Sequence, residues 1–169
     1  IPKQPMIGCN DFLINKSASV MLIGDSHLDA VGLHIQQSLK DKGIGSYAVS
    51  YSGCIPIKGL YRVDKDDSHK CQEYNDAMIE YARTMNIKTL ILIARFPLYL
   101  MGSPYDNGEG GVENDSPKYV DGVEYKSSKL GWNNETRIKR VSEIYKSSLE
   151  ELSKEFQVII FSPTPEVGT

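Results

Sequence analysis

The chain has 169 residues, 40% of them hydrophobic and 24% charged, with a formal net charge of −3 at pH 7. This composition fits one globular domain, and it lacks the basic balance that a nucleic-acid-binding protein needs. No apolar run reaches the ~20 residues of a membrane-spanning helix. No spacing of cysteine and histidine indicates a metal site. Because the chain begins at Ile1, we expect it to be a segment of a longer protein, with any signal peptide or membrane anchor upstream.

The first half of the chain predicts alternating strands and helices. Residues 1–17 are punctuated by proline, glycine and asparagine and are expected to form an N-terminal extension or linker. The apolar run 18–24 predicts a buried strand. Apolar residues then recur every three or four positions over 28–42, which predicts a helix ending before Gly43. A second, weaker strand is predicted at 47–51.

The second half continues this alternation and contains one insertion. Helical spacing from Tyr74 ends near Asn86 and precedes the most apolar strand, 89–94, which we expect at the centre of the sheet. Residues 101–134 are rich in Gly, Asn, Asp and Ser and show no period, which is typical of a functional insertion. The last two elements are a helix that spans 138–156, with Asn134 or Thr136 as its N-cap, and a strand at 158–161. This order predicts an α/β fold over 18–169 with a parallel sheet covered on both faces.

The tetrapeptide Gly24-Asp25-Ser26-His27 directly follows the first predicted strand. A serine at the start of a helix after a buried strand exposes its hydroxyl at the carboxyl edge of the sheet, where ligands bind. The helix N-terminus would also direct N–H groups toward an oxyanion there. Ser26 is therefore the candidate nucleophile, and the structural alternative is that it only caps the helix.

Two further residues are expected at the same edge. Gly53 lies in the turn after the second strand, where the lack of a Cβ lets its N–H approach an oxyanion. Arg95 ends the most buried strand and offers fixed donors to an oxyanion or a sugar-ester carbonyl. A turn glycine and a strand-end salt bridge are the structural alternatives. Among the three histidines, His27 is a poor general base because neighbouring side chains diverge, and neither of the others is favoured.

Three cysteines are present, Cys9, Cys54 and Cys71. The last two flank a polar loop, and a disulfide between them would contribute roughly 3 kcal/mol in an oxidising compartment. Spacing alone leaves open a second interpretation, in which all three are reduced and buried. No glycine-rich phosphate-binding motif follows the first strand, so nucleotide binding is not indicated.

With these residues in place, the chain resembles the SGNH-hydrolase domains of the GDSL esterase-like superfamily, which have a three-layer, flavodoxin-like sheet. More narrowly, it resembles the periplasmic SGNH domain at the C-terminus of acyltransferase-3 membrane proteins. The resemblance covers about residues 18–169. It rests on Val-Met-Leu-Ile-Gly-Asp-Ser-His at 20–27, Ser-Gly-Cys-Ile-Pro at 52–56, Cys-Gln-Glu-Tyr-Asn at 71–75 and Ile-Leu-Ile-Ala-Arg-Phe at 91–96.

The resemblance implies roles for some residues and leaves others unassigned. Ser26 matches the family's nucleophile and Gly53 its oxyanion glycine. The family's Gly-x-Asn-Asp is replaced at the end of the third strand, so Arg95 is the candidate third donor, with the Ser26 and Gly53 N–H groups. The final Asp-x-x-His block is not identified at all in this sequence, so we expect the domain to lack its last strand and this segment within these residues.

The resemblance also implies a function and a location. We expect an O-acetyltransferase domain that moves acetyl through Ser26 to a sugar hydroxyl of a bacterial surface polysaccharide such as lipopolysaccharide O-antigen. The acyltransferase-3 membrane domain of the same protein would deliver acetyl from acetyl-CoA. A periplasmic location favours the Cys54–Cys71 disulfide. The alternatives are a carbohydrate esterase and a non-catalytic glycan-binding domain on a degenerate SGNH fold. Aromatic residues of the 101–134 insertion would form a sugar platform or a packed cover: Tyr105, Tyr119, Tyr125 and Trp132.

Overall fold

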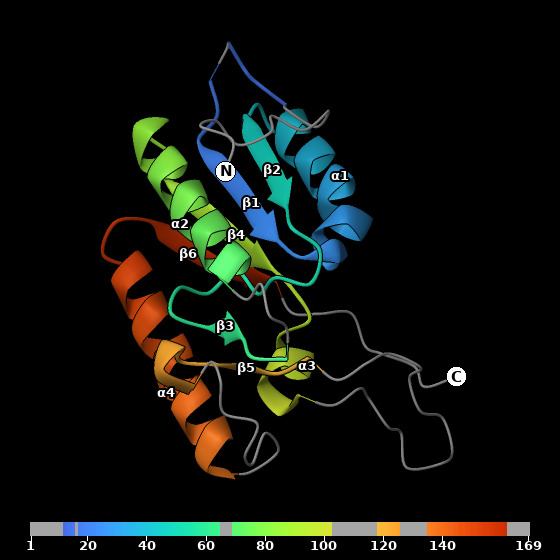
Figure 1. Cartoon of the computed structure of the whole chain (residues 1–169). Coiled ribbons are helices and arrows are strands. Elements are labelled where there is room, and N and C mark those ends of the chain that lie inside the picture. The colour runs from blue at the N-terminus through green and yellow to red at the C-terminus, as the bar shows by residue number, and fades with distance from the viewer. Residues whose placement is uncertain (1–11, 16, 65–68, 103–117, 126–134, 162–169) are drawn as a thin grey trace, which may run out of the picture.

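The computed structural model of the chain describes residues 12–15, 17–64, 69–102, 118–125 and 135–161 (Figure 1). Its main sheet consists of four parallel strands in the order β2–β1–β4–β6. Their bounds are Val20–Gly24 for β1, Ser46–Ser50 for β2, Thr89–Ile93 for β4 and Gln157–Phe161 for β6. The strands start level with one another, because Val20 pairs with Ser46 and Thr89, and Thr89 pairs with Gln157. Their carboxyl ends therefore meet at one edge of the sheet.

Helices cover both faces of this sheet (Figure 1). Helix α1 (Ser26–Asp41) packs on one face, with Leu28 in a cluster with Val20, Leu22, Ile91 and Ile93. Helices α2 (His69–Thr84) and α4 (Glu135–Leu152) pack on the other face, where they form the larger core. The predicted three-layer α/β fold with a parallel sheet is confirmed. Its strand order, taken along the chain as 2-1-3-4, is that of the flavodoxin-like arrangement.

The ends of α1 follow from local chemistry. The carboxylate of Asp25 caps the first turn by accepting a hydrogen bond from the His27 backbone N–H at 2.8 Å. Beyond the last turn, Gly43 adopts a φ of 73°, and its N–H donates to Lys40 O at 2.8 Å. The Ile44 N–H donates to the carbonyl of Leu39, which completes a Schellman motif. The helix ends where Gly43 predicts, and it begins two residues earlier than the apolar spacing predicts.

Several short elements have no periodic signal and were not predicted. Strands β3 (Tyr61–Arg62) and β5 (Val120–Asp121) pair antiparallel as a separate two-stranded sheet. Helix α3 (Phe96–Met101) follows β4, and a 3-10 turn, η1, spans Val123–Tyr125. Thus β5 and η1 lie inside the segment that was expected to be aperiodic.

The two ends of this inserted segment are anchored to the domain. The Lys118 N–H donates to Gly102 O at 3.1 Å, so the chain returns to the point at which it leaves α3. Arg137 of α4 is 1% exposed and donates to the carbonyl oxygens of Val120, at 2.9 Å, and Leu100. One buried guanidinium therefore joins α3, β5 and α4.

The start of α4 differs from the prediction. Thr136 lies inside α4 and is not its N-cap, whereas Asn134 falls outside the described residues. The described part of the extension pairs with the domain, because Phe12 and Ser46 exchange backbone hydrogen bonds of 3.1 and 2.7 Å. The ammonium of Lys40 lies 5.2 Å from the centroid of the Phe12 ring.

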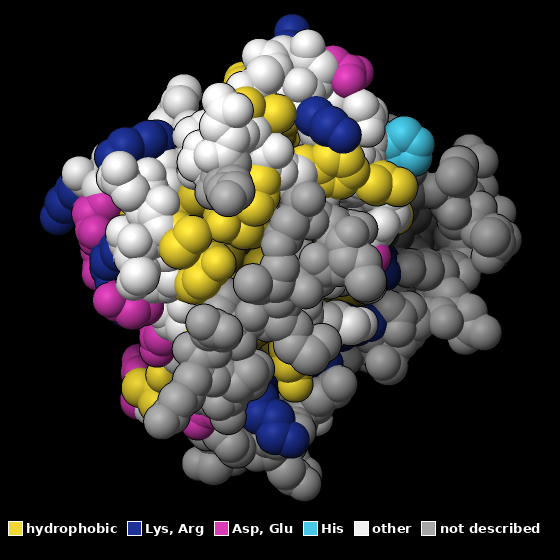
Figure 2. Space-filling view, turned by 90° about the horizontal axis from the view of Figure 1, so that it is seen from above, with side chains coloured by type: hydrophobic (Ala, Val, Ile, Leu, Met, Phe, Trp, Pro, Cys, Tyr) yellow, Lys and Arg dark blue, Asp and Glu magenta, His cyan; other side chains and the backbone are white. Residues whose placement is uncertain are grey.

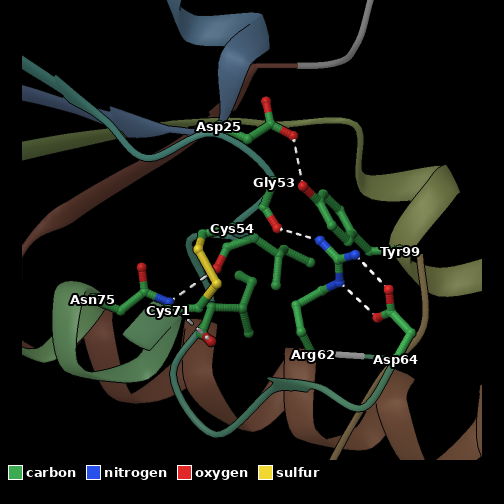
Figure 3. The surroundings of a disulfide bond; sticks show 10 residues. Asp25, Gly53, Cys54, Arg62, Asp64, Cys71, Asn75 and Tyr99 are labelled. Atoms are coloured by element: carbon green, nitrogen blue, oxygen red, sulfur yellow. Dashed lines mark hydrogen bonds and ion pairs between the residues drawn. A yellow bond between two sulfur atoms is a disulfide. The ribbon is translucent and has the colours of Figure 1, made fainter. Parts of the chain in front are cut away.

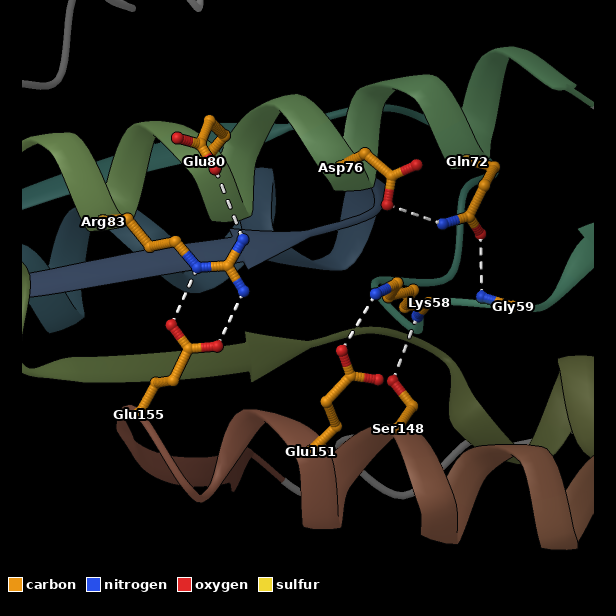
Figure 4. A network of polar contacts seen from close by, with 9 residues as sticks. All are labelled: Lys58, Gly59, Gln72, Asp76, Glu80, Arg83, Ser148, Glu151 and Glu155. Carbon is orange, nitrogen blue, oxygen red and sulfur yellow. Dashed lines mark hydrogen bonds and ion pairs between the residues drawn. The ribbon is translucent and has the colours of Figure 1, made fainter.

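Polar contacts hold α2 and the loop before β3 against α4 (Figure 4). Arg83 of α2 donates two hydrogen bonds, of 2.8 and 2.7 Å, to the carboxylate of Glu155. Lys58 pairs with Glu151 at 2.9 Å, and its backbone N–H donates to Ser148 Oγ at 3.2 Å. These contacts fix the loop that carries the second motif.

The surface is charged with both signs, and part of it is apolar. Figure 2 shows Lys and Arg interspersed with Asp and Glu along one side, and hydrophobic side chains gathered in the middle of that face. Strand β6 is apolar yet exposed, with Ile159 at 42% and Ile160 at 43%. Within the described ranges, no strand pairs with the outer edge of β6. None of the helices in those ranges combines the length and apolar character needed to cross a bilayer.

Candidate active site

The loops after β1, β2 and β4 converge at the carboxyl edge of the sheet and line one cavity of about 290 Å³. The cavity lining includes the three residues singled out from the sequence: Ser26, Gly53 and Arg95. It also includes Asp25, Arg62, Tyr99 and Lys118. The site is therefore assembled from segments that are far apart in the chain.

Ser26 is exposed and is the first residue of α1. Its hydroxyl is not needed as a helix cap, because the preceding Asp25 provides the cap. Neither the hydroxyl nor the backbone N–H of Ser26 makes a hydrogen bond to another residue in the described part of the chain. The capping alternative for Ser26 is therefore wrong, and Ser26 lines the cavity at the positive end of the helix dipole.

Asp25 joins the turn that carries Ser26 to the loop after β4. Its side chain is only 2% exposed, and Oδ1 accepts from the His27 N–H. Oδ2 accepts two further hydrogen bonds, from the Arg95 N–H at 3.2 Å and from the Tyr99 hydroxyl at 3.1 Å (Figure 3). Burial, with the neighbouring carboxylate second, raises the pKa of Tyr99 well above 10.0, so this phenol remains a donor at neutral pH.

A hydrogen bond from Arg62 holds the turn that carries Gly53. Gly53 adopts a φ of 74°, and its carbonyl oxygen accepts a hydrogen bond of 2.7 Å from Arg62 Nη1. Arg62 is 3% exposed and also binds the Asp64 carboxylate through Nε and Nη2 (Figure 3). A Cβ at position 53 would lie 3.2 Å from Arg62 Nη1. The Gly53 N–H makes no hydrogen bond within the described ranges, so it is available to a ligand in the cavity.

A disulfide fixes the same turn to α2. Cys54 and Cys71 are bonded, with Cα atoms 5.3 Å apart, and both side chains are buried (Figure 3). Asn75, one turn further along α2, donates from Nδ2 to Ile55 O at 2.9 Å. The Gly53 turn is therefore held by Arg62 on one side and by the disulfide on the other.

Arg95 is 8% exposed at the end of β4, and its backbone N–H is bound to Asp25. Its side chain shares the cavity with Ser26, Gly53 and Lys118. The structure thus brings Arg95 to the same cavity as Ser26 and Gly53, and its role as a third oxyanion donor stays a prediction.

The structure does not assign a general base. His27 is partly buried beside Ser26, His34 is exposed further along α1, and the side chain of His69 is outside the described residues. The sequence prediction overlooked an Asp-x-x-His tetrapeptide at 66–69, whose histidine is the first residue of α2. It does not follow the last strand, as the block does in the family. In the part of the chain that the structure describes, no group of three His, Cys, Asp or Glu side chains is placed to hold a metal ion.

Three cavity residues were missed from the sequence: Arg62, Tyr99 and Lys118. Arg62 belongs to β3, and a strand of two residues gives no clear signal. Tyr99 follows Arg95 by one helical turn, and the Pro97 between them is a helix-start signal. Lys118 lies in the aperiodic insertion, and nothing in the sequence pointed to it.

A comparison with family models gives one match, to the family described as "SGNH domain (fused to AT3 domains)", over residues 6–169. No curated protein and no solved structure matches the chain significantly. The match spans both sheets and every residue that lines the cavity.

Proposed function

The chain belongs to the family of SGNH domains that are fused to AT3 domains, and on this premise we propose that it transfers acetyl groups to a bacterial surface polysaccharide. The observation that carries this proposal is the cavity that Ser26, Gly53 and Arg95 line together. The proposed acceptor is a sugar hydroxyl, such as one in lipopolysaccharide O-antigen.

In the proposed reaction, a histidine takes the Ser26 proton while Oγ attacks the acetyl carbonyl. The bond between acetyl and its donor then breaks, the leaving group of the donor takes the proton from the histidine, and acetyl-Ser26 remains. A sugar hydroxyl attacks this ester and passes its proton to the histidine. The bond between acetyl and Oγ breaks, the histidine returns the proton to Oγ, and the acetylated sugar leaves. We assign the base to the histidine of the family's Asp-x-x-His block, which we expect in the parent protein after Thr169, because His27 is too close in sequence to Ser26.

The oxyanion formed at each step would be held by three donors. These are the Ser26 N–H at the start of α1, the Gly53 N–H and the Arg95 guanidinium. Loss of one such donor typically lowers the rate ~100-fold or more. Asp25 and Arg62 touch no reacting atom in this scheme. They position the two turns that carry the N–H groups.

The proposed setting is the periplasmic side of a bacterial inner membrane. The family's AT3 domain would supply acetyl from cytoplasmic acetyl-CoA and would be the partner within the same protein. The Cys54–Cys71 disulfide supports this location, because disulfides persist in oxidising compartments.

The test replaces Ser26 in the full-length protein, expressed in a strain that lacks its own copy. Ser26→Ala should abolish polysaccharide O-acetylation, measured by NMR of the purified polysaccharide. Ser38→Ala is the matched control, because Ser38 is exposed on the same helix and bonds only to His34 O. Unchanged acetylation in Ser26→Ala would reject the proposal. His69→Ala should leave acetylation intact, and its loss would move the base to the 66–69 tetrapeptide.

One observation favours a second candidate, a non-catalytic glycan-binding domain. The family's Gly-x-Asn-Asp is replaced after β4, where Ala94-Arg95-Phe96 stands. Such a domain would bind the polysaccharide equally well with alanine at position 26, and acetylation would not depend on this serine. A carbohydrate esterase differs only in using water as the acceptor, and would release acetate from acetylated polysaccharide.

A further inference from the structure

An exposed aromatic residue directly precedes two residues of the Ser26 cavity wall in the chain. Tyr51 is 41% exposed and immediately follows β2. Its backbone N–H donates to Gly24 O at 2.9 Å, two residues before Ser26. The next two residues, Ser52 and Gly53, line the cavity. The Tyr51 ring is thus carried by a backbone segment that is tied to the nucleophile turn.

A second tyrosine supports this ring. Tyr74 of α2 has its ring centroid 5.2 Å from that of Tyr51, with an interplanar angle of 44°. The Tyr74 hydroxyl is buried and has no hydrogen-bond partner in the described part of the chain. Burial, and to a lesser extent the charge of Asp29, raise the pKa of Tyr74, so the phenol stays neutral. Tyr51 is therefore backed by a fixed ring and still presents surface to solvent.

A carboxylate completes this group of side chains. Asp29 is exposed on α1, three residues after Ser26, and side chains at this spacing share one face of a helix. Its Oδ1 accepts a hydrogen bond of 2.5 Å from Ser50 Oγ, at the residue before Tyr51. Its Oδ2 has no partner among the described residues. One carboxylate oxygen thus remains available between the nucleophile and the tyrosine.

We propose that Tyr51 and Asp29 form the acceptor subsite, which holds an uncharged pyranose ring of the polysaccharide beside Ser26. This inference rests on the proposed acyl transfer. The C–H face of a pyranose packs on the negative face of an aromatic ring, and a carboxylate accepts hydrogen bonds from sugar hydroxyls. A sugar held by both side chains would be positioned for attack on acetyl-Ser26. The charge of Asp29 disfavours an acidic sugar at this position.

The test compares Tyr51→Ala with Tyr51→Phe in the full-length protein. Two readouts are needed: polysaccharide O-acetylation, and labelling of Ser26 by a fluorophosphonate probe, which needs the nucleophile but no sugar. We expect Tyr51→Ala to lower acetylation about tenfold, the upper end of what one aromatic contact contributes. Labelling should be unchanged. Tyr51→Phe, which keeps the ring, should behave as the native protein, and Asp29→Asn should lower acetylation without affecting labelling.

The outcomes separate this inference from the proposed function. Equal acetylation by the native protein and Tyr51→Ala would overturn the subsite, as would a parallel loss of labelling, since that would indicate only a structural role. Failure of the proposed function would appear elsewhere, as unchanged acetylation in Ser26→Ala.

Discussion

Removal of the Cys54–Cys71 disulfide should destabilise the domain and loosen the turn that carries Gly53 at the same time. The two cysteines are separated by 17 positions in the sequence. Closing a loop of this length in the unfolded chain costs entropy equivalent to about 3 kcal/mol at 25 °C, which is the stabilisation that the bridge provides. The double variant Cys54→Ala/Cys71→Ala should therefore lose about 3 kcal/mol of unfolding free energy.

Pulse proteolysis of the full-length protein in increasing urea measures this loss. With a denaturant dependence of about 1–3 kcal/mol/M, the midpoint for this domain should fall by about 1–3 M. Cys9→Ala is the matched control and should leave the midpoint unchanged. Dithiothreitol should reproduce the shift in the native protein and have no effect on the double variant. An unchanged urea midpoint of the native protein in dithiothreitol would refute this prediction, because the disulfide would then not restrict the unfolded chain.

Two further substitutions test the hydrogen bond between Tyr99 and Asp25 and the ion pair between Arg83 and Glu155. Tyr99→Phe removes a hydrogen-bond donor from the buried carboxylate of Asp25 and should lower the free energy of unfolding by about 1.5–3 kcal/mol. The same proteolysis assay measures this loss, and an unshifted urea midpoint would contradict the prediction. Arg83 lowers the pKa of Glu155 below its ordinary value of 4.5. The ion pair between them therefore stabilises the fold in full above pH 4.5, and this stabilisation is lost as the pH falls through the lowered pKa of Glu155. The stability difference between the native protein and Arg83→Gln should therefore be constant near neutral pH and close on acidification below 4.5, and a difference that persists in strong acid would show that it does not come from Glu155.

Most of the main sheet and its helices could be predicted because their signals are long and periodic. The strand at 89–94 is apolar on both faces, and the structure places it between two other strands. Gly43 marked the end of the first helix because only its left-handed conformation completes the cap. The β3–β5 pair could not be predicted, since each strand has two residues and the partners are remote in sequence.

The same distinction applies to the candidate site, where some residues could be predicted and others could not. Ser26, Gly53 and Arg95 were accessible to prediction because each follows a recognisable strand, and parallel strands end at one edge. The residues that hold those turns could not be predicted, because their roles arise from tertiary contacts. Tyr99 acts through the buried Asp25, and Arg62 reaches Gly53 from another sheet. Sequence patterns report backbone periodicity and give little information on such contacts.

The hydrogen bond between Lys118 and Gly102 has a consequence for how this domain can vary. The chain leaves and rejoins the fold at a single fixed point, and Lys118 belongs to the cavity wall. Each doubling of the length of a loop costs only about 0.6 kcal/mol in closure entropy. Segments of different length and sequence can therefore be exchanged between these two anchors with little loss of stability. Related domains can therefore differ between these two anchors, next in sequence to the Lys118 wall of the cavity, while the sheet, the disulfide and the serine turn stay as they are.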